Sequence, residues 1–318
     1  MWNAAGRCAH LAVISAPLSA LLSLGNVAAH ESAHSGKQSI SVRYDIPKEQ
    51  AHREIYETMR QRRVLEQVAA ALGLVRLPKR LTYRLKECSG EPNAWYDPRT
   101  RTVTVCYELV SSILRLAPAT TSPAGVSRND AVRGPVLQIL LHESSHALFD
   151  LLRTPVLGRE EDAADQVASL VLLHLAPADA RAVVNGSAYF FATLGKHEPI
   201  DRGSFADAHG LTWQRFYNLA CLAYGSDRRR YGYIVEKGYL PTERARACEE
   251  EYNQIDFAFQ ALIVPHLRVS PRHGARLRRA ISNVLRTHKG DRMVLGIGVA
   301  PAAWHPPPVV ACWQDALD

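Results

Sequence analysis

The sequence lacks several features that would each point to a particular class of protein. It has no two cysteines separated by two residues, no internal repeat and, after residue 29, no long apolar run. A helix that spans a bilayer needs about 20 apolar residues, so stable membrane insertion is not expected. Cysteine-based zinc sites typically use closely spaced cysteine pairs, so a site of that kind is not expected either.

Strong charge is also missing. The 318 residues have a formal net charge of +7, with 47% apolar and 22% charged residues, as is ordinary for a soluble globular protein. Much of the positive excess lies between Arg268 and Arg292. We therefore expect no nucleic-acid partner, and enough apolar residues for one large domain or two small ones.

The two ends of the chain differ from its middle. Arg7 precedes an apolar run over residues 11–29, which closes on the small residues Val27, Ala28 and Ala29. This pattern predicts a signal peptide at residues 1–29 and export to the periplasm or the exterior, with a retained N-terminal helix as the alternative. Residues 270–318 are basic and then proline-rich, with little periodicity. They are predicted to form a tail after a domain of residues 30–269.

Four of the cysteines form two local pairs along the chain. Cys88 and Cys106 flank a predicted hairpin, and Cys221 and Cys248 flank a second unit. An exported protein meets an oxidising environment in which such pairs form disulfides. We therefore predict one disulfide within each pair, with four buried free thiols as the alternative.

Apolar periodicity predicts a mostly helical chain with one small group of strands. The predicted helices cover residues 47–74, 109–116, 134–152, 158–176, 178–194, 213–224 and 243–267, and the predicted strands cover residues 81–85, 93–96 and 102–105. Residues 30–46 form a polar stretch, and residues 117–131 have the composition of an exposed loop. Pro135 suits the first position of its helix.

One segment has a metal-binding pattern, His142-Glu143-Ser144-Ser145-His146. On a helix, residues four apart lie one turn apart on one face, so both imidazoles can converge on one zinc ion. Glu143 follows the first ligand, where it can reach an attacking water without binding the metal. The flanking residues are apolar, and a buried polar side chain without a partner costs on the order of several kcal/mol. Metal ligation by His142 and His146 accounts for their presence there.

The next predicted helix opens with several acidic residues that could supply a third ligand. Glu161 and Asp165 are four residues apart and share a face, whereas Glu160 points about a quarter turn away. We predict Glu161 as the third ligand of a single Zn²⁺ and Asp165 as the carboxylate that accepts the other N–H of a ligating imidazole. The alternative is that these acids only stabilise the helix N-terminus, by placing negative charge near the positive end of the helix dipole. That role is predicted for Glu160 and Asp162.

A peptide-hydrolysing site also needs a donor that stabilises the developing oxyanion. The candidates are His209, Arg215 and Tyr217, which follow the acidic helix in sequence. Each of them could equally be a core or surface residue. His174 lies in an apolar stretch and is predicted to be structural.

Together these segments resemble the gluzincin zinc peptidases, which pair HExxH with a downstream Glu-x-x-x-Asp. More narrowly, they resemble one family of bacterial secreted metallopeptidases, known largely as a domain of unknown function. The segments are residues 93–96, the helix HESSHALFDLL, and residues 155–165, 214–218 and 221–227, within a likeness over residues 44–267. The resemblance implies an α+β, zincin-like fold, mostly helical with a small mixed sheet packed on the HExxH helix. It also implies that the strand at residues 93–96 lines the cleft and pairs with an extended peptide, with a plain hairpin as the alternative.

The residues and the resemblance predict an exported zinc metallopeptidase that acts on peptides or proteins. Zinc would activate a water, with Glu143 as the general base. The main alternative is a catalytically inactive zinc-binding scaffold that acts as a binding module, whose metal would have four protein ligands. A third hypothesis, binding of an anionic surface by the basic C-terminal stretch, predicts steep salt dependence.

Overall fold

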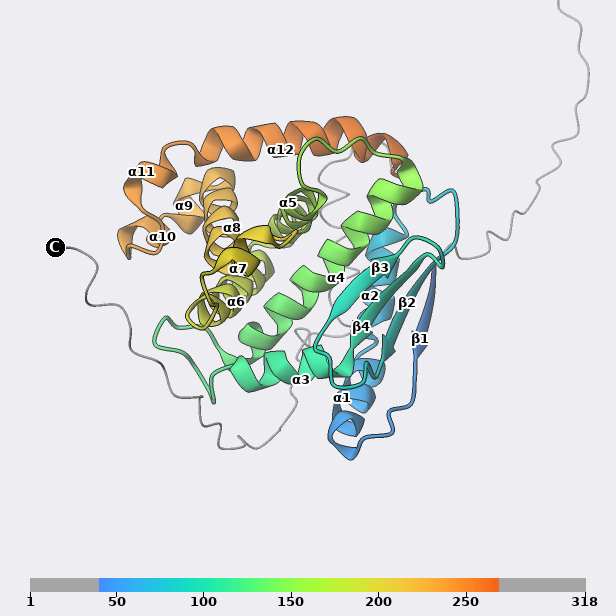
Figure 1. Cartoon of the computed structure of the whole chain (residues 1–318). Coiled ribbons are helices and arrows are strands. Elements are labelled where there is room, and N and C mark those ends of the chain that lie inside the picture. The colour runs from blue at the N-terminus through green and yellow to red at the C-terminus, as the bar shows by residue number, and fades with distance from the viewer. Residues whose placement is uncertain (1–39, 269–318) are drawn as a thin grey trace, which may run out of the picture. The chain divides into compact units, whose positions relative to one another are not determined.

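The structure is a computed structural model that describes residues 40–268 (Figure 1). It is mostly helical with one small mixed sheet, in agreement with the predicted α+β class. The strands are β1 (Ile40–Tyr44), β2 (Leu81–Lys86), β3 (Ala94–Asp97) and β4 (Thr102–Cys106). The helices are α1 (Gln50–Gln61), α2 (Val64–Leu72), α3 (Tyr107–Leu116), α4 (Arg128–Leu152), α5 (Glu160–Leu173), α6 (Pro177–Gly195), α7 (Arg202–Ala206), α8 (Thr212–Ser226), α9 (Arg228–Tyr231), α10 (Tyr233–Glu236), α11 (Thr242–Ala245), α12 (Cys248–Leu262) and the 3-10 helix η1 (Val264–His266).

The sheet has the strand order β1-β2-β4-β3, with β1, β2 and β4 parallel and β3 antiparallel to β4. Leu81, Tyr83 and Leu85 of β2 are buried and the residues between them are half-buried. One face of the sheet therefore carries the core. The Tyr83 hydroxyl is hydrogen-bonded to that of Ser144, so α4 packs on this buried face.

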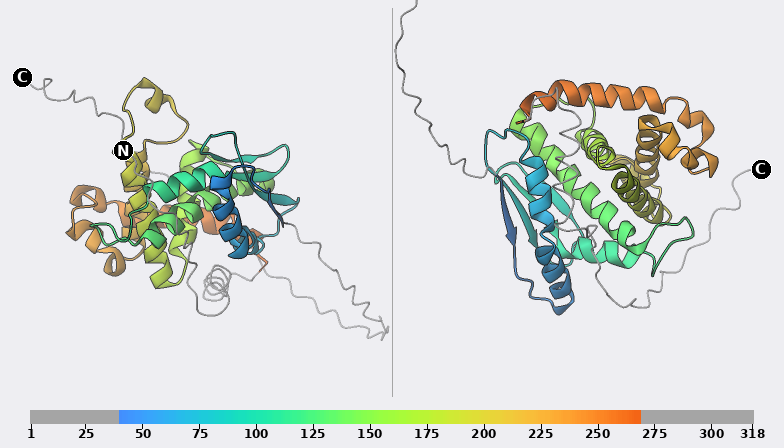
Figure 2. Two further views of the ribbon diagram at one scale, coloured as in Figure 1. Left: turned by 90° about the horizontal axis from the view of Figure 1, so that it is seen from below. Right: turned by 180° about the vertical axis from the view of Figure 1, so that it is seen from behind.

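The helix α4 runs through the middle of the described residues. The sheet lies on one side of it, and α5, α6 and α8 lie on the other (Figure 1). Seen from behind, α1 and α2 lie beside α4 and the sheet (Figure 2). This position surrounds α4 with apolar partners along most of its length, and the candidate metal ligands lie on its second half.

The strand β1 is absent from the sequence-based prediction, which has only a polar stretch before residue 47. Its five residues pair in parallel register with β2, Ile40 beside Leu81 and Tyr44 beside Leu85. A parallel pairing joins segments that are about 40 residues apart in this chain. The strand is therefore stabilised by a distant segment, which local periodicity does not reveal.

The prediction of one helix over residues 47–74 is wrong, because the structure has two. The helices α1 and α2 are separated at Arg63, whose φ of 52° is left-handed. The last buried side chain of α1 is Met59 and the first of α2 is Val64. In one continuous helix, the step of five residues from Met59 to Val64 would turn the apolar face away from the core. The break at Arg63 returns the apolar face of α2 to the core.

The start of α4 also differs from the prediction. The helix begins at Arg128, because the Ser127 side chain accepts a hydrogen bond from the Asp130 backbone nitrogen at 3.1 Å, as an N-cap residue does. Pro135 consequently lies inside the helix rather than at its first position. At the other end of the fold, the predicted helix over residues 243–267 is divided into α11, α12 and η1.

Two glycines allow α4 and α6 to approach each other closely. A Cβ atom on Gly186 of α6 would lie 1.8 Å from the Asp130 carbonyl oxygen, and one on Gly134 of α4 would lie 2.5 Å from Ser187 N. Both contacts are with backbone, which cannot move aside without separating the helices. We expect Gly186→Ala to lower the free energy of unfolding by about 1–3 kcal/mol, as overpacking of a core does.

Urea unfolding of the purified protein checks this prediction. Gly73→Ala is the matched control, because Gly73 has an ordinary helical φ of −60° and its added Cβ would meet nothing closer than 3.2 Å. A Gly186→Ala protein as stable as the Gly73→Ala protein would contradict the close approach of α4 and α6.

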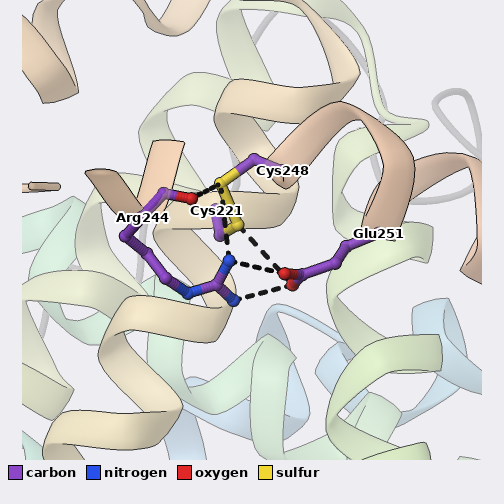
Figure 3. The surroundings of a disulfide bond; sticks show 4 residues. All are labelled: Cys221, Arg244, Cys248 and Glu251. Carbon is purple, nitrogen blue, oxygen red and sulfur yellow. Dashed lines mark hydrogen bonds and ion pairs between the residues drawn. A yellow bond between two sulfur atoms is a disulfide. The ribbon is translucent and has the colours of Figure 1, made fainter. Parts of the chain in front are cut away.

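Both predicted disulfides are present, Cys88–Cys106 and Cys221–Cys248. The first joins the loop after β2 to the end of β4, and the second joins α8 to α12. Figure 3 shows the second bond beside an ion pair between Arg244 and Glu251. Each side of α4 therefore has one disulfide, which joins elements on that side.

Some sequence-based predictions lie outside the described residues. These are the signal peptide at residues 1–29 and the tail at residues 270–318, so the predicted domain boundaries stay predictions. Within residues 40–268, no helix is both long enough and apolar enough to cross a membrane.

Candidate metal centre

One stripe of α4 faces a cavity. Over residues 131–149 of this helix, only Ile139 and His146 are not buried, and Asp150 just after them is exposed. Together with His142 and Glu143, these residues line a cavity of about 930 Å³. The steps from Ile139 to His142, His146 and Asp150 are three, four and four residues, and such steps follow one helical face. The helix therefore presents both histidines to the same space.

The structure brings His142, His146 and Glu161 together. The Nε2 atoms of the two histidines are 3.2 Å apart, and Glu161 Oε2 lies 3.0 Å from that of His142 and 3.2 Å from that of His146. Glu161 is on the first turn of α5, which packs against α4. These three atoms form a group that could hold a metal ion.

The residues described contain one further group of potential metal-binding side chains, Cys88, Cys106 and Glu108. The two sulfurs form a disulfide, and a disulfide provides no thiolate ligand. His142, His146 and Glu161 therefore form the candidate centre.

Asp165 lies behind His142, where the sequence predicts it. Its Oδ1 atom is 2.8 Å from His142 Nδ1, and both of its oxygens are bonded to the guanidinium of Arg215. Burial raises the pKa of Asp165, but the hydrogen bonds from His142 and Arg215 outweigh this effect and hold that pKa well below its usual range. Asp165 is consequently an anion that orients the imidazole.

Glu160 differs from its prediction. It is placed at the helix N-terminus, but its Oε1 atom lies 2.7 Å from Nδ1 of His146 instead of pointing away. Each histidine thus has a carboxylate from α5 behind it.

The other two acids of this turn are also paired. The hydrogen bond with His142 is the main reason that the pKa of Glu161 falls to about 2. Asp162 lies in the first turn of α5 and pairs with Arg159, in agreement with a role at the helix end.

Glu143 faces the cavity but is not part of the group of three. Only 7% of its surface is exposed, and burial raises its pKa above the usual value of a glutamate. A buried carboxylate beside a cation site has the environment of a general base.

Of the three candidate oxyanion donors, only His209 faces the group with an exposed side chain. It lies between α7 and α8, with Nε2 2.9 Å from Glu161 Oε2 and Nδ1 3.1 Å from Asp207 Oδ1. Its ring stacks on that of His142, with 5.7 Å between centroids. The structure does not bring Tyr217 to the cavity, because it lines a separate pocket beside Arg159.

The edge strand β3 forms one wall of the cavity. The Tyr96 hydroxyl donates a hydrogen bond to Asp150 at 2.7 Å, which ties β3 to α4. The remaining walls come from α3, α4, α5, α6, α8, the loop after α4 and the loop before α8. The lining residues are Pro92, Asn93, Ala94, Trp95, Tyr96, Pro98, Leu109, Ile139, His142, Glu143, His146, Phe149, Asp150, Thr154, Val156, Glu160, Glu161, Phe190, Phe191, Leu194, His209 and Arg215.

Comparison with known proteins agrees with this geometry. A family model described as "Putative metallopeptidase" matches residues 44–263, a range that contains the whole candidate centre. No curated protein and no solved structure matches the chain. A metallopeptidase implies a bound metal and a peptide or protein substrate. The narrower family resemblance of the sequence is thus confirmed, and the chain belongs to the family that this description, "Putative metallopeptidase", names.

Proposed function

We propose that this protein is an exported zinc peptidase that cleaves peptide bonds with Glu143 as the general base. The observation that carries the proposal is the placement of His142, His146 and Glu161 at the wall of a cavity of about 930 Å³, beside a buried Glu143. The gluzincin subtype and a zincin-like fold are part of the same proposal, supported by the order of these residues along α4 and α5.

The donor set fits zinc. Two imidazoles and one carboxylate are the protein ligands of catalytic zinc sites in several peptidases. Zinc bonds of about 2.0–2.1 Å in tetrahedral geometry place ligand atoms roughly 3.3 Å apart. The three distances in this protein are 3.0, 3.2 and 3.2 Å. Little rearrangement would be needed to accept the ion. When bound, zinc would supply Lewis acidity and an activated water.

The chain's own residues supply the remaining chemistry. Glu143 would accept a proton from the attacking water at its carboxylate and pass it to the leaving amine nitrogen. His209 Nε2 lies 2.9 Å from Glu161 Oε2, and it would turn its N–H to the oxyanion once that oxygen holds the metal, while Asp207 holds the other ring nitrogen. Asp165 and Glu160 would keep the two ligating imidazoles in place.

The number of ligands favours an enzyme over an inactive scaffold. Structural zinc sites are closed by four protein ligands, and catalytic sites keep one position open. The described group has three members, and His209 contacts it only through Glu161, with Nε2 2.9 Å from Oε2. The edge strand β3 supports a peptide substrate, because an extended chain can add to such an edge by backbone hydrogen bonds. The two disulfides support export.

Metal removal tests the proposal. We expect the purified protein to contain one zinc ion per chain and to cleave members of a quenched fluorescent peptide library. Cleavage should stop after treatment with 1,10-phenanthroline and return on addition of zinc. Equal cleavage by metal-free protein would refute the mechanism, and a folded zinc-loaded protein without any cleavage would favour the inactive binding module.

A second prediction concerns His209. We expect His209→Ala to lower kcat by about 100-fold, the usual cost of losing one oxyanion donor, and to leave the zinc content unchanged. Steady-state kinetics and metal analysis of one preparation measure both. His197→Ala is the control, because His197 is an exposed histidine between α6 and α7 that does not line the cavity. Loss of zinc from the His209→Ala protein would instead identify His209 as a fourth ligand.

A further inference from the structure

Arg215 of α8 is bonded to the candidate centre through Asp165. Its Nε atom lies 2.6 Å from Asp165 Oδ2, and its Nη2 atom lies 2.8 Å from Oδ1. Asp165 Oδ1 in turn lies 2.8 Å from His142 Nδ1. A continuous chain of hydrogen bonds therefore crosses three helices, from α8 through α5 to α4.

We propose that Arg215 is a positioning residue, which sets the affinity and geometry of the metal site by holding Asp165 against His142. The inference rests on the metal site of the proposed function and does not depend on peptide cleavage.

The first argument concerns Asp165. Only 17% of its side chain is exposed, so its carboxylate has little water to fix its charge or its orientation. An arginine fork bonded to both oxygens fixes the plane of a carboxylate as well as its position. That plane determines where the imidazole of His142 points its Nε2 atom. The carboxylate behind His146 is different, because the Glu160 side chain is 53% exposed. The rigid support of the centre is thus on the His142 side.

The second argument concerns Arg215 itself. Its guanidinium lies over the ring of Phe191, 4.8 Å from the centroid, and its side chain is 21% exposed. Two of its nitrogens are bonded to Asp165. Arg215 lines the cavity, but these bonds direct its guanidinium to the metal site rather than to the oxyanion. A lysine in its place could offer one point charge but no fork.

The chain contains a matched control for this ion pair. Arg244 also forms a two-point contact with a carboxylate, through Nη1 and Nη2 to Glu251 at 2.6 and 2.7 Å, beside the Cys221–Cys248 disulfide (Figure 3). The Arg244 pair does not touch His142, His146 or Glu161. Removing either arginine breaks a two-point ion pair, but only the loss of Arg215 should reach the metal.

The test compares zinc affinity, measured by competition with a chromogenic chelator, in Arg215→Gln and Arg244→Gln. We expect Arg215→Gln to weaken zinc binding about 10–100-fold, the usual effect of losing an outer partner of a ligand, and Arg244→Gln to change it less than about twofold. The absorption bands of the Co²⁺-substituted protein should shift in the first variant only. Unchanged zinc affinity in folded Arg215→Gln protein would overturn the inference. If that variant does not fold, Arg215→Lys takes its place: an intermediate affinity supports the inference and a wild-type affinity overturns it.

A double variant tests the route. If Arg215 acts through Asp165, adding Arg215→Gln to Asp165→Asn should cause no further loss of zinc affinity, since coupled residues are not additive. A fully additive loss would show that Arg215 acts by another route and would overturn the inference. Absence of zinc binding by the wild-type protein would refute the proposed function together with this inference. Tight binding by both wild type and Arg215→Gln would refute this inference alone.

Discussion

Replacing Glu143 by glutamine is expected to lower kcat by about 1,000-fold and to leave one zinc ion bound. A glutamine has nearly the same shape as the glutamate, but it cannot accept the proton, and general acid–base catalysis contributes about 10²–10⁴ to a rate. Zinc should stay because Glu143 is not part of the ligand group. Steady-state kinetics on a peptide from the library and metal analysis of the same sample measure both quantities.

Ser145→Ala is the control from the same motif. Its hydroxyl is bonded to the Leu141 carbonyl of its own helix, and Ser145 does not line the cavity. This variant should keep wild-type kinetics. Hydrolysis by Glu143→Gln at the wild-type rate would remove the general-base role, and loss of zinc from that variant would point to a role for Glu143 in metal binding.

Replacing Glu161 by alanine is expected to weaken zinc binding by more than about 100-fold, the upper range for loss of an outer partner of a ligand. The variant removes one of three protein ligands, so its effect should be larger than that of Arg215→Gln. The cleavage of peptides should fall with the zinc content. Competition with a chromogenic chelator measures the affinity.

Asp162→Ala is the matched control for this variant. Asp162 belongs to the same acidic first turn of α5, but it pairs with Arg159 rather than with the histidines. The control protein should bind zinc like the wild type. Equal affinities in the Glu161→Ala and wild-type proteins would show that these acids serve only the helix N-terminus.

The helix period accounts for much of what the sequence could predict about this centre. Residues four apart share a helix face, so His142 and His146 could be paired, and so could Glu161 and Asp165. The same rule applied to Glu160 was misleading. At the first turn of α5 a side chain that points away from one histidine reaches the other, Nδ1 of His146. The period gives directions around one helix, but not the position of the neighbouring helix.

Arg215 and Tyr217 show the same limit on α8. They are two residues apart and point to different sides of their helix, yet sequence alone offered both as donors. Packing of α8 against α5 and α6 decides between them. It turns Arg215 toward Asp165 and leaves Tyr217 beside another pocket.

The sequence by itself determined the helix that carries the two histidines, the acidic helix after it and the hairpin of β3 and β4, and it predicted the pairs of cysteines that the structure shows as disulfides. Each of these follows from local periodicity or from neighbours along the chain. The tertiary structure alone decided the strand β1, the division between α1 and α2 and the contact of Glu160 with His146. It also decided the link from Arg215 through Asp165 to His142. Arg215 and Asp165 are 50 positions apart in the sequence. Such contacts depend on how helices and strands pack, and packing is set by the whole core rather than by any one segment.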